Sequence, residues 1–84
     1  MKMEELIGRL EESGDFERGF LARTMMYKYI ELEAGANIEI RYKSFQFLNG
    51  CLKTLEGLSE ITEEEGKELW KEIYGLLGGG KERS

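Results

Sequence analysis

Cys51 is the only thiol in the 84-residue sequence and therefore the first residue to test for nucleophilic chemistry. A catalytic cysteine needs a neighbouring base that holds it as the thiolate, and the chain contains no histidine. Cys51 also lies beside an apolar stripe of Phe45, Leu48, Leu52 and Leu55, at the three- and four-residue steps of a helix. We therefore expect a packed, unreactive cysteine.

Carboxylates form two clusters in the sequence, and acid–base or metal chemistry would need them to converge. The clusters are Glu11, Glu12 and Asp15, and then Glu63, Glu64, Glu65 and Glu68. Both lie at predicted helix ends or on solvent faces, where carboxylates cap helices or are hydrated. Neither has the ligand spacing of a calcium loop. We therefore expect no enzyme, no metal and no cofactor.

The segment Gly78-Gly79-Gly80-Lys81 contains the residue types of a phosphate-binding loop. Such a loop precedes a helix, so that the helix N-terminus faces the anion, whereas this segment follows a predicted helix. We interpret it as the point where that helix stops. The sequence therefore predicts one helical domain, residues 1–77, followed by a flexible glycine-rich tail, residues 78–84.

The composition limits the classes of partner. The net charge is −5, and 35% of the residues are charged. An acidic chain of this kind favours a basic protein surface over nucleic acid or an acidic membrane. The sequence contains no apolar run long enough to span a membrane and no secretory signal, so a cytoplasmic protein is expected.

Apolar periodicity predicts an all-α protein, a compact bundle of about four helices that ends in an αα-hairpin. The expected helices cover residues 3–13, 16–34, 43–56 and 63–77, and the last begins with a capping box of Thr62 and Glu65. Residues 38–43 alternate apolar and charged side chains, which favours a short extended connector. An early helix start capped by Asn37, or a strand paired across a dimer axis, are the alternatives.

The core is expected to draw on all four helices. Its predicted members are Leu6, Leu10, Phe16, Phe20, Tyr27, Ile30, Phe45, Leu48, Leu52, Leu55, Leu69, Ile73 and Leu77.

The helix at residues 16–34 is apolar on two sides, which indicates that it is buried on two sides. One stripe is the expected core contribution of Phe16, Phe20, Tyr27 and Ile30. The opposite stripe is Leu21, Met25, Tyr29 and Leu32. An 84-residue chain has few elements with which to cover both, so we assign the opposite stripe to a homodimer or partner face. The alternative is that the other helices cover it internally.

The segment from Leu52 to Leu77 places the turn Ile61-Thr62-Glu63-Glu64-Glu65 between two leucine-rich helices. It resembles the SHOCT-type hairpins at the C-termini of bacterial proteins, and departs from them at Gly66, where an aromatic residue is usual. The resemblance implies an oligomerisation hairpin.

These features favour a small acidic, non-enzymatic protein–protein interaction module that self-associates and binds a basic protein. A phage or mobile-element inhibitor, such as an anti-defence or anti-CRISPR factor, is one form. The expected contact residues are an acidic surface and aromatic anchors: Glu63, Glu64, Glu65, Glu68, Phe47, Trp70 and Tyr74. The alternatives are a structural oligomerisation unit and a small DNA-binding regulator that uses the region from Arg41 to Lys53.

Overall fold

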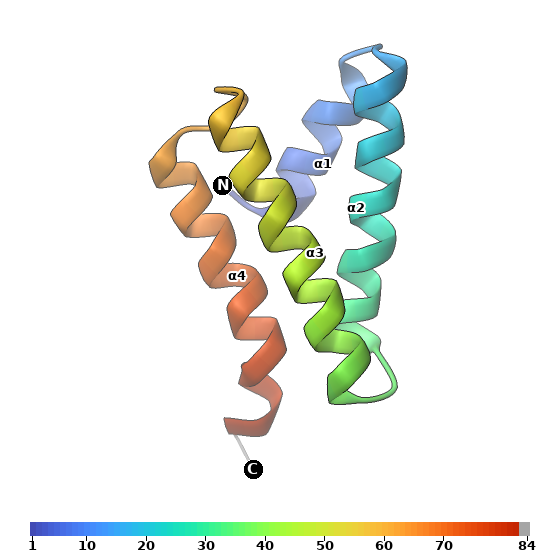
Figure 1. Ribbon diagram of the computed structural model, residues 1–84, viewed down its shortest axis with the longest axis vertical. Helices are drawn as coiled ribbons and strands as arrows, with labels where there is room; N and C mark the ends of the chain where they lie inside the picture. The colour runs from blue at the N-terminus through green and yellow to red at the C-terminus, as the bar shows by residue number, and fades with distance from the viewer. Residues whose placement is uncertain (83–84) are drawn as a thin grey trace.

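A computed structural model describes residues 1–82, and the side chains of residues 1–78. It contains four helices and, among the described residues, no strand: α1 Met3–Glu12, α2 Phe16–Ala34, α3 Ile38–Gly57 and α4 Glu63–Glu82. The predicted all-α bundle is therefore confirmed. In Figure 1, α3 lies between α2 and α4, and α1 crosses behind them.

Local capping chemistry explains two of the helix starts. The Asp15 carboxylate accepts a hydrogen bond from the Arg18 N–H at 2.9 Å, directly after Gly14, whose φ of +79° only glycine adopts easily. At α4, the Thr62 hydroxyl accepts from the Glu65 N–H at 3.0 Å, and the Glu65 carboxylate accepts from the Thr62 N–H at 2.9 Å. The predicted capping box is present.

The extended connector predicted for residues 38–43 is wrong. These residues form the first turns of α3, and the side-chain oxygen of Asn37 accepts a hydrogen bond from the Ile40 N–H at 2.9 Å. Alternating residues form a strand only where a ladder partner exists, and the described chain offers none. Ile38 and Ile40 are exposed, so the alternation does not mark a buried face.

The triple glycine does not end α4, whose bounds run through it to Glu82. The helix break predicted at Gly78 is therefore not found. Arg83 and Ser84, the end of the predicted tail, lie outside the described residues. No described helix is both long and apolar enough to cross a membrane.

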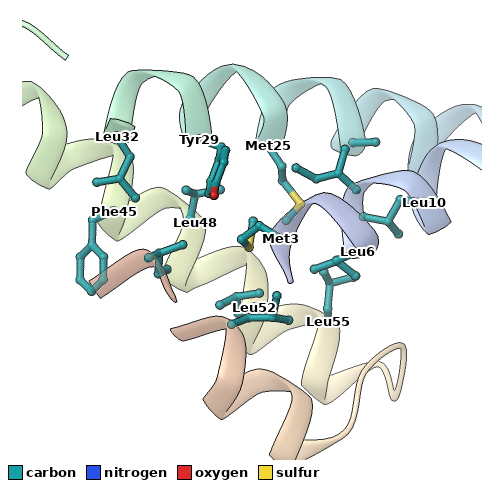
Figure 2. Close-up of a cluster of buried hydrophobic side chains, with 14 of the residues drawn as sticks. Met3, Leu6, Leu10, Met25, Tyr29, Leu32, Phe45, Leu48, Leu52 and Leu55 are labelled. Atoms are coloured by element: carbon teal, nitrogen blue, oxygen red, sulfur yellow. The ribbon is translucent and has the colours of Figure 1, made fainter. Parts of the chain in front are cut away.

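The core lies between the four helices, where α3 packs against α2 and α4, and α1 packs against α2 (Figure 2). Its buried members include Met3, Leu6, Leu10, Met25, Tyr29, Leu32, Phe45, Leu48, Leu52, Leu55, Leu69, Ile73 and Leu77. The predicted contributions of α1, α3 and α4 are confirmed. Those of α2 are wrong, because Phe16, Phe20, Tyr27 and Ile30 are exposed, and Met25, Tyr29 and Leu32 fill the core instead.

A polar contact fixes α2 against α3 beside this core. The buried Ser44 hydroxyl donates to the Glu31 carboxylate at 2.9 Å, and the Lys28 ammonium lies 3.4 Å from the same oxygen. The bond from Ser44 and the charge of Lys28 lower the pKa of Glu31. These contacts hold the two helices in one rotational setting, which determines the face that α2 turns outward.

Candidate interaction surface

Four large apolar side chains stand on the outer side of α2. The exposed fractions are 80% for Phe16, 61% for Phe20, 60% for Tyr27 and 53% for Ile30. Together with Arg23 and Ala34, also exposed, they form what we call the α2 outer face. In Figure 1, α2 is the right-hand edge of the molecule, and no described helix lies beyond it. The α2 outer face is therefore open to a partner.

The residues predicted as a partner face lie elsewhere. Met25 and Leu32 are fully buried, Tyr29 is buried, and Leu21 is half-buried. Figure 2 shows Met25, Tyr29 and Leu32 pointing from α2 toward the side chains of α3 and α1. The other helices therefore cover this stripe, which is the alternative stated above. The inner and outer sides of α2 are the reverse of those predicted from the sequence.

The sequence contains one signal that would have separated the two sides. Arg23 lies in the middle of the stripe from Phe16 to Ala34, and its side chain is exposed. The opposite stripe contains no charged residue, so it can be buried without desolvating an ion. A guanidinium within an apolar stripe therefore indicates the solvent side, even where the stripe is rich in aromatics.

A second aromatic group lies where α3 meets α4, and we call it the aromatic edge: Tyr42, Phe45, Trp70 and Tyr74. The Trp70 and Tyr74 rings stack with centroids 4.7 Å apart and planes 9° apart. Phe45 meets both edge-on at 6.3 and 6.1 Å. Since Phe45 is buried, it anchors the stack, and Tyr42, Trp70 and Tyr74 keep exposed surface. Two predicted anchors, Trp70 and Tyr74, thus belong to one cluster.

A cleft of about 340 Å³ adjoins the aromatic edge. Lys53 of α3 and Lys67, Trp70 and Lys71 of α4 line it. The Glu56 side chain lies directly against Gly66, where a β-carbon would collide with its carboxylate. A larger residue at position 66 would therefore displace the Glu56 carboxylate from this position.

The third predicted anchor, Phe47, belongs to a different surface. It lines an apolar groove of about 350 Å³ between α2 and α3, together with Leu21, Cys51 and Leu58. The Lys28 ammonium lies 5.6 Å from the Phe47 ring centroid. Burial raises the pKa of the half-buried Cys51 thiol, which disfavours the reactive thiolate.

Of the four glutamates of the predicted acidic surface, two make contacts within the chain and two are exposed to solvent. Glu65 belongs to the capping box and lies 4.0 Å from Arg9. Glu68 accepts a bond from the Met1 amino group at 2.5 Å, which lowers the Glu68 pKa. Glu63 and Glu64 are exposed. Two of the four glutamates thus keep the free charge that a basic partner requires.

Arg41, the first cation of the proposed DNA-binding region, is held by the backbone. Its Nε donates to the Leu32 carbonyl at 3.0 Å, and its Nη2 donates to the Leu76 carbonyl at 2.5 Å. The guanidinium thus joins the end of α2 to α4 across the first turn of α3. Of the three cations in that region, only Lys43 and Lys53 are exposed to solvent. Two exposed positive charges do not favour nucleic-acid binding.

Comparison with known proteins provides no assignment. Scans of protein-family models, curated proteins and solved structures find nothing that matches this chain. In the part of the chain whose side chains are described, no three acidic or cysteine residues converge in a way that could hold a metal ion. The exposed surfaces are therefore the features of this chain that bear on its function.

Glu72 of α4 joins its helix to α1 and α2. The Tyr29 hydroxyl donates to one of its carboxylate oxygens at 2.5 Å, and the Met3 N–H donates to the other at 2.9 Å. Burial, with the bond to Glu72 and its negative charge, raises the pKa of Tyr29 above its ordinary value of 10.0.

The free energy of unfolding is expected to fall as the pH rises above the ordinary tyrosine pKa, and Tyr29→Phe is expected to reduce that fall. The unfolded chain releases the phenol proton first, whereas the folded chain retains it, so alkali favours the unfolded state. Urea unfolding of both proteins near neutrality and at about pH 11 measures the difference. Identical losses of stability in the two proteins would contradict the prediction.

Proposed function

We propose that this protein is a non-enzymatic protein–protein interaction module that works through the α2 outer face. The observation that carries the proposal is the exposure of Phe16, Phe20, Tyr27 and Ile30 on one side of a single helix. Large apolar residues gathered on one surface are typical of binding sites, and aromatic residues and arginine are enriched where interfaces contribute most energy. Arg23 at the centre of the face fits this composition.

The packing of α2 supports the same proposal. Ser44 and Lys28 hold Glu31 on the α3 side of the helix, and Met25 and Leu32 fill the core. Rotating α2 to bury Phe20 or Tyr27 would expose these core residues and break the contacts at Glu31. A small rearrangement of the chain would therefore not cover the outer face, which leaves it available to another molecule.

The net charge of −5 supports a partner with a basic surface for the remainder of the molecule. Exposed Glu63 and Glu64 at the start of α4 would contribute to that contact. Such binding weakens as salt screens the charges, whereas burial of the α2 outer face does not. An inhibitor of a nucleic-acid-binding protein is one function of this kind.

The test compares wild type with Phe20→Glu, and uses Tyr74→Glu as the matched control on the aromatic edge. Size-exclusion chromatography with light scattering reports self-association, and capture of binding proteins from cell extract reports other complexes. Phe20→Glu is expected to lose complexes that wild type and Tyr74→Glu both form. If Phe20→Glu retains every complex that wild type forms, or wild type forms none, the proposal fails. Circular dichroism confirms that each variant is folded.

A further inference from the structure

We infer that the occupant of the α2 outer face is a second copy of this chain, whose α2 lies antiparallel to the first. The inference rests on the proposed function and names its partner. Residues 16, 20, 23, 27, 30 and 34 follow one another at steps of four, three, four, three and four. This is the repeat that packs one helix along another in a coiled coil, which a surface helix of a monomer does not need.

The face is self-complementary in the antiparallel direction. Its six positions are symmetric in the sequence about residue 25, so two antiparallel copies align in three kinds of layer. Phe16 faces Ala34 of the second copy, a large side chain against a small one. Phe20 faces Ile30 in the next layer. Arg23 faces Tyr27, so the guanidinium can lie on an aromatic ring on each side of the two-fold axis.

Arg23 also selects the antiparallel direction over the parallel one. A parallel, in-register pair would place Arg23 against Arg23 of the second copy and desolvate two like charges, which is unfavourable. Among the described residues no carboxylate forms an ion pair with Arg23 that would neutralise it. In the antiparallel pair, each Arg23 guanidinium instead lies against Tyr27 of the other copy.

The area available is sufficient for a dimer of moderate affinity. Fully buried aromatic side chains cover about 150–250 Å² each, so the four exposed apolar residues offer roughly 500 Å² per copy. Two copies would bury about 1,000 Å², close to the lower limit for a specific interface.

Cysteine cross-linking tests both the occupant and its direction. Phe16→Cys and Ala34→Cys, each combined with Cys51→Ser, alter opposite ends of the exposed face. A short bismaleimide is added to each variant alone and to an equal mixture in which one variant carries a size tag. The antiparallel pair is expected to give a cross-linked mixed dimer at a severalfold higher yield than either variant alone. Two copies of one variant would hold their cysteines about 27 Å apart, beyond the reach of a short reagent.

Lys53→Cys mixed with Ala34→Cys is the matched control, because Lys53 lies on the α3–α4 cleft and should give only background cross-linking. Efficient cross-linking of Phe16→Cys with itself would show a parallel pair and overturn the inference. No cross-linking above the control would show that the face does not take a second copy in this way, and would also overturn it. The proposed function would survive that second result if Phe20→Glu still abolished capture of a different protein.

Discussion

Met25→Glu is expected to abolish the folded state, whereas Phe20→Glu, on the same helix, is expected to leave it intact. Met25 is completely buried against α1 and α3. An unpaired buried carboxylate costs several kcal/mol, and loss of the methionine packing costs about 2–5 kcal/mol more. A domain of this size has roughly 5 kcal/mol of stability to lose. Phe20 is mostly exposed, so its replacement should change stability by about 0.5 kcal/mol or less.

Circular dichroism followed through urea titration measures both outcomes. Met25→Glu should show no cooperative transition, and Phe20→Glu should unfold near the wild-type midpoint when both are measured at a concentration low enough for wild type to be monomeric. The experiment distinguishes the two sides of α2, because the interpretation from sequence alone placed Phe20 inside and Met25 outside. A folded Met25→Glu together with an unfolded Phe20→Glu would contradict the arrangement described here.

Arg41→Met is expected to lower the free energy of unfolding by about 2–3 kcal/mol, the second largest effect on the described structure. The substitution retains most of the side chain's length but removes the donors to the Leu32 and Leu76 carbonyls. Both carbonyls lose a charged partner, and the link between the end of α2 and α4 is lost. Arg41→Lys should recover only part of the loss, since one ammonium cannot reproduce the geometry of the guanidinium.

Lys43→Met is the matched control, because it removes a neighbouring positive charge of α3 that is exposed to solvent. Its free energy of unfolding should stay within about 0.5 kcal/mol of wild type. Urea unfolding measured by tryptophan fluorescence follows both variants, since Trp70 lies at the contact between α3 and α4. Equal stabilities for Arg41→Met and Lys43→Met would show that the two carbonyl contacts contribute nothing.

Two helix boundaries set by local capping could be predicted from the sequence, whereas the start of α3 was misplaced although Asn37 caps it. Thr62 with Glu65 and Gly14 with Asp15 marked their helix ends correctly, because capping is local. The start of α3 was misplaced because alternation of Ile38, Glu39 and Ile40 is a strand pattern only when another strand is present. The Asn37 cap decides for the early helix start, which the sequence also offers as an alternative.

The candidate surface was harder to predict because α2 is apolar on both sides. Apolar content alone favours Phe16, Phe20, Tyr27 and Ile30 as core, since three of them are aromatic, against one in the stripe of Leu21, Met25, Tyr29 and Leu32. Which side of α2 faces the core depends on which stripe can be buried without also burying a charged side chain. It also depends on tertiary contacts such as that of Ser44 with Glu31. The backbone contacts of Arg41 join residues distant in sequence, and no local pattern indicates them.

Because α3 lies between α2 and α4, one chain has two separate surfaces that other molecules can reach at the same time. In Figure 1, α2 and α4 lie on opposite sides of α3. The α2 outer face belongs to the first of these two helices, and the aromatic edge with its lysine-lined cleft lies where α3 meets α4. Occupying one surface leaves the other accessible. A pair joined through α2 would then leave two identical aromatic edges accessible on one particle, one on each copy.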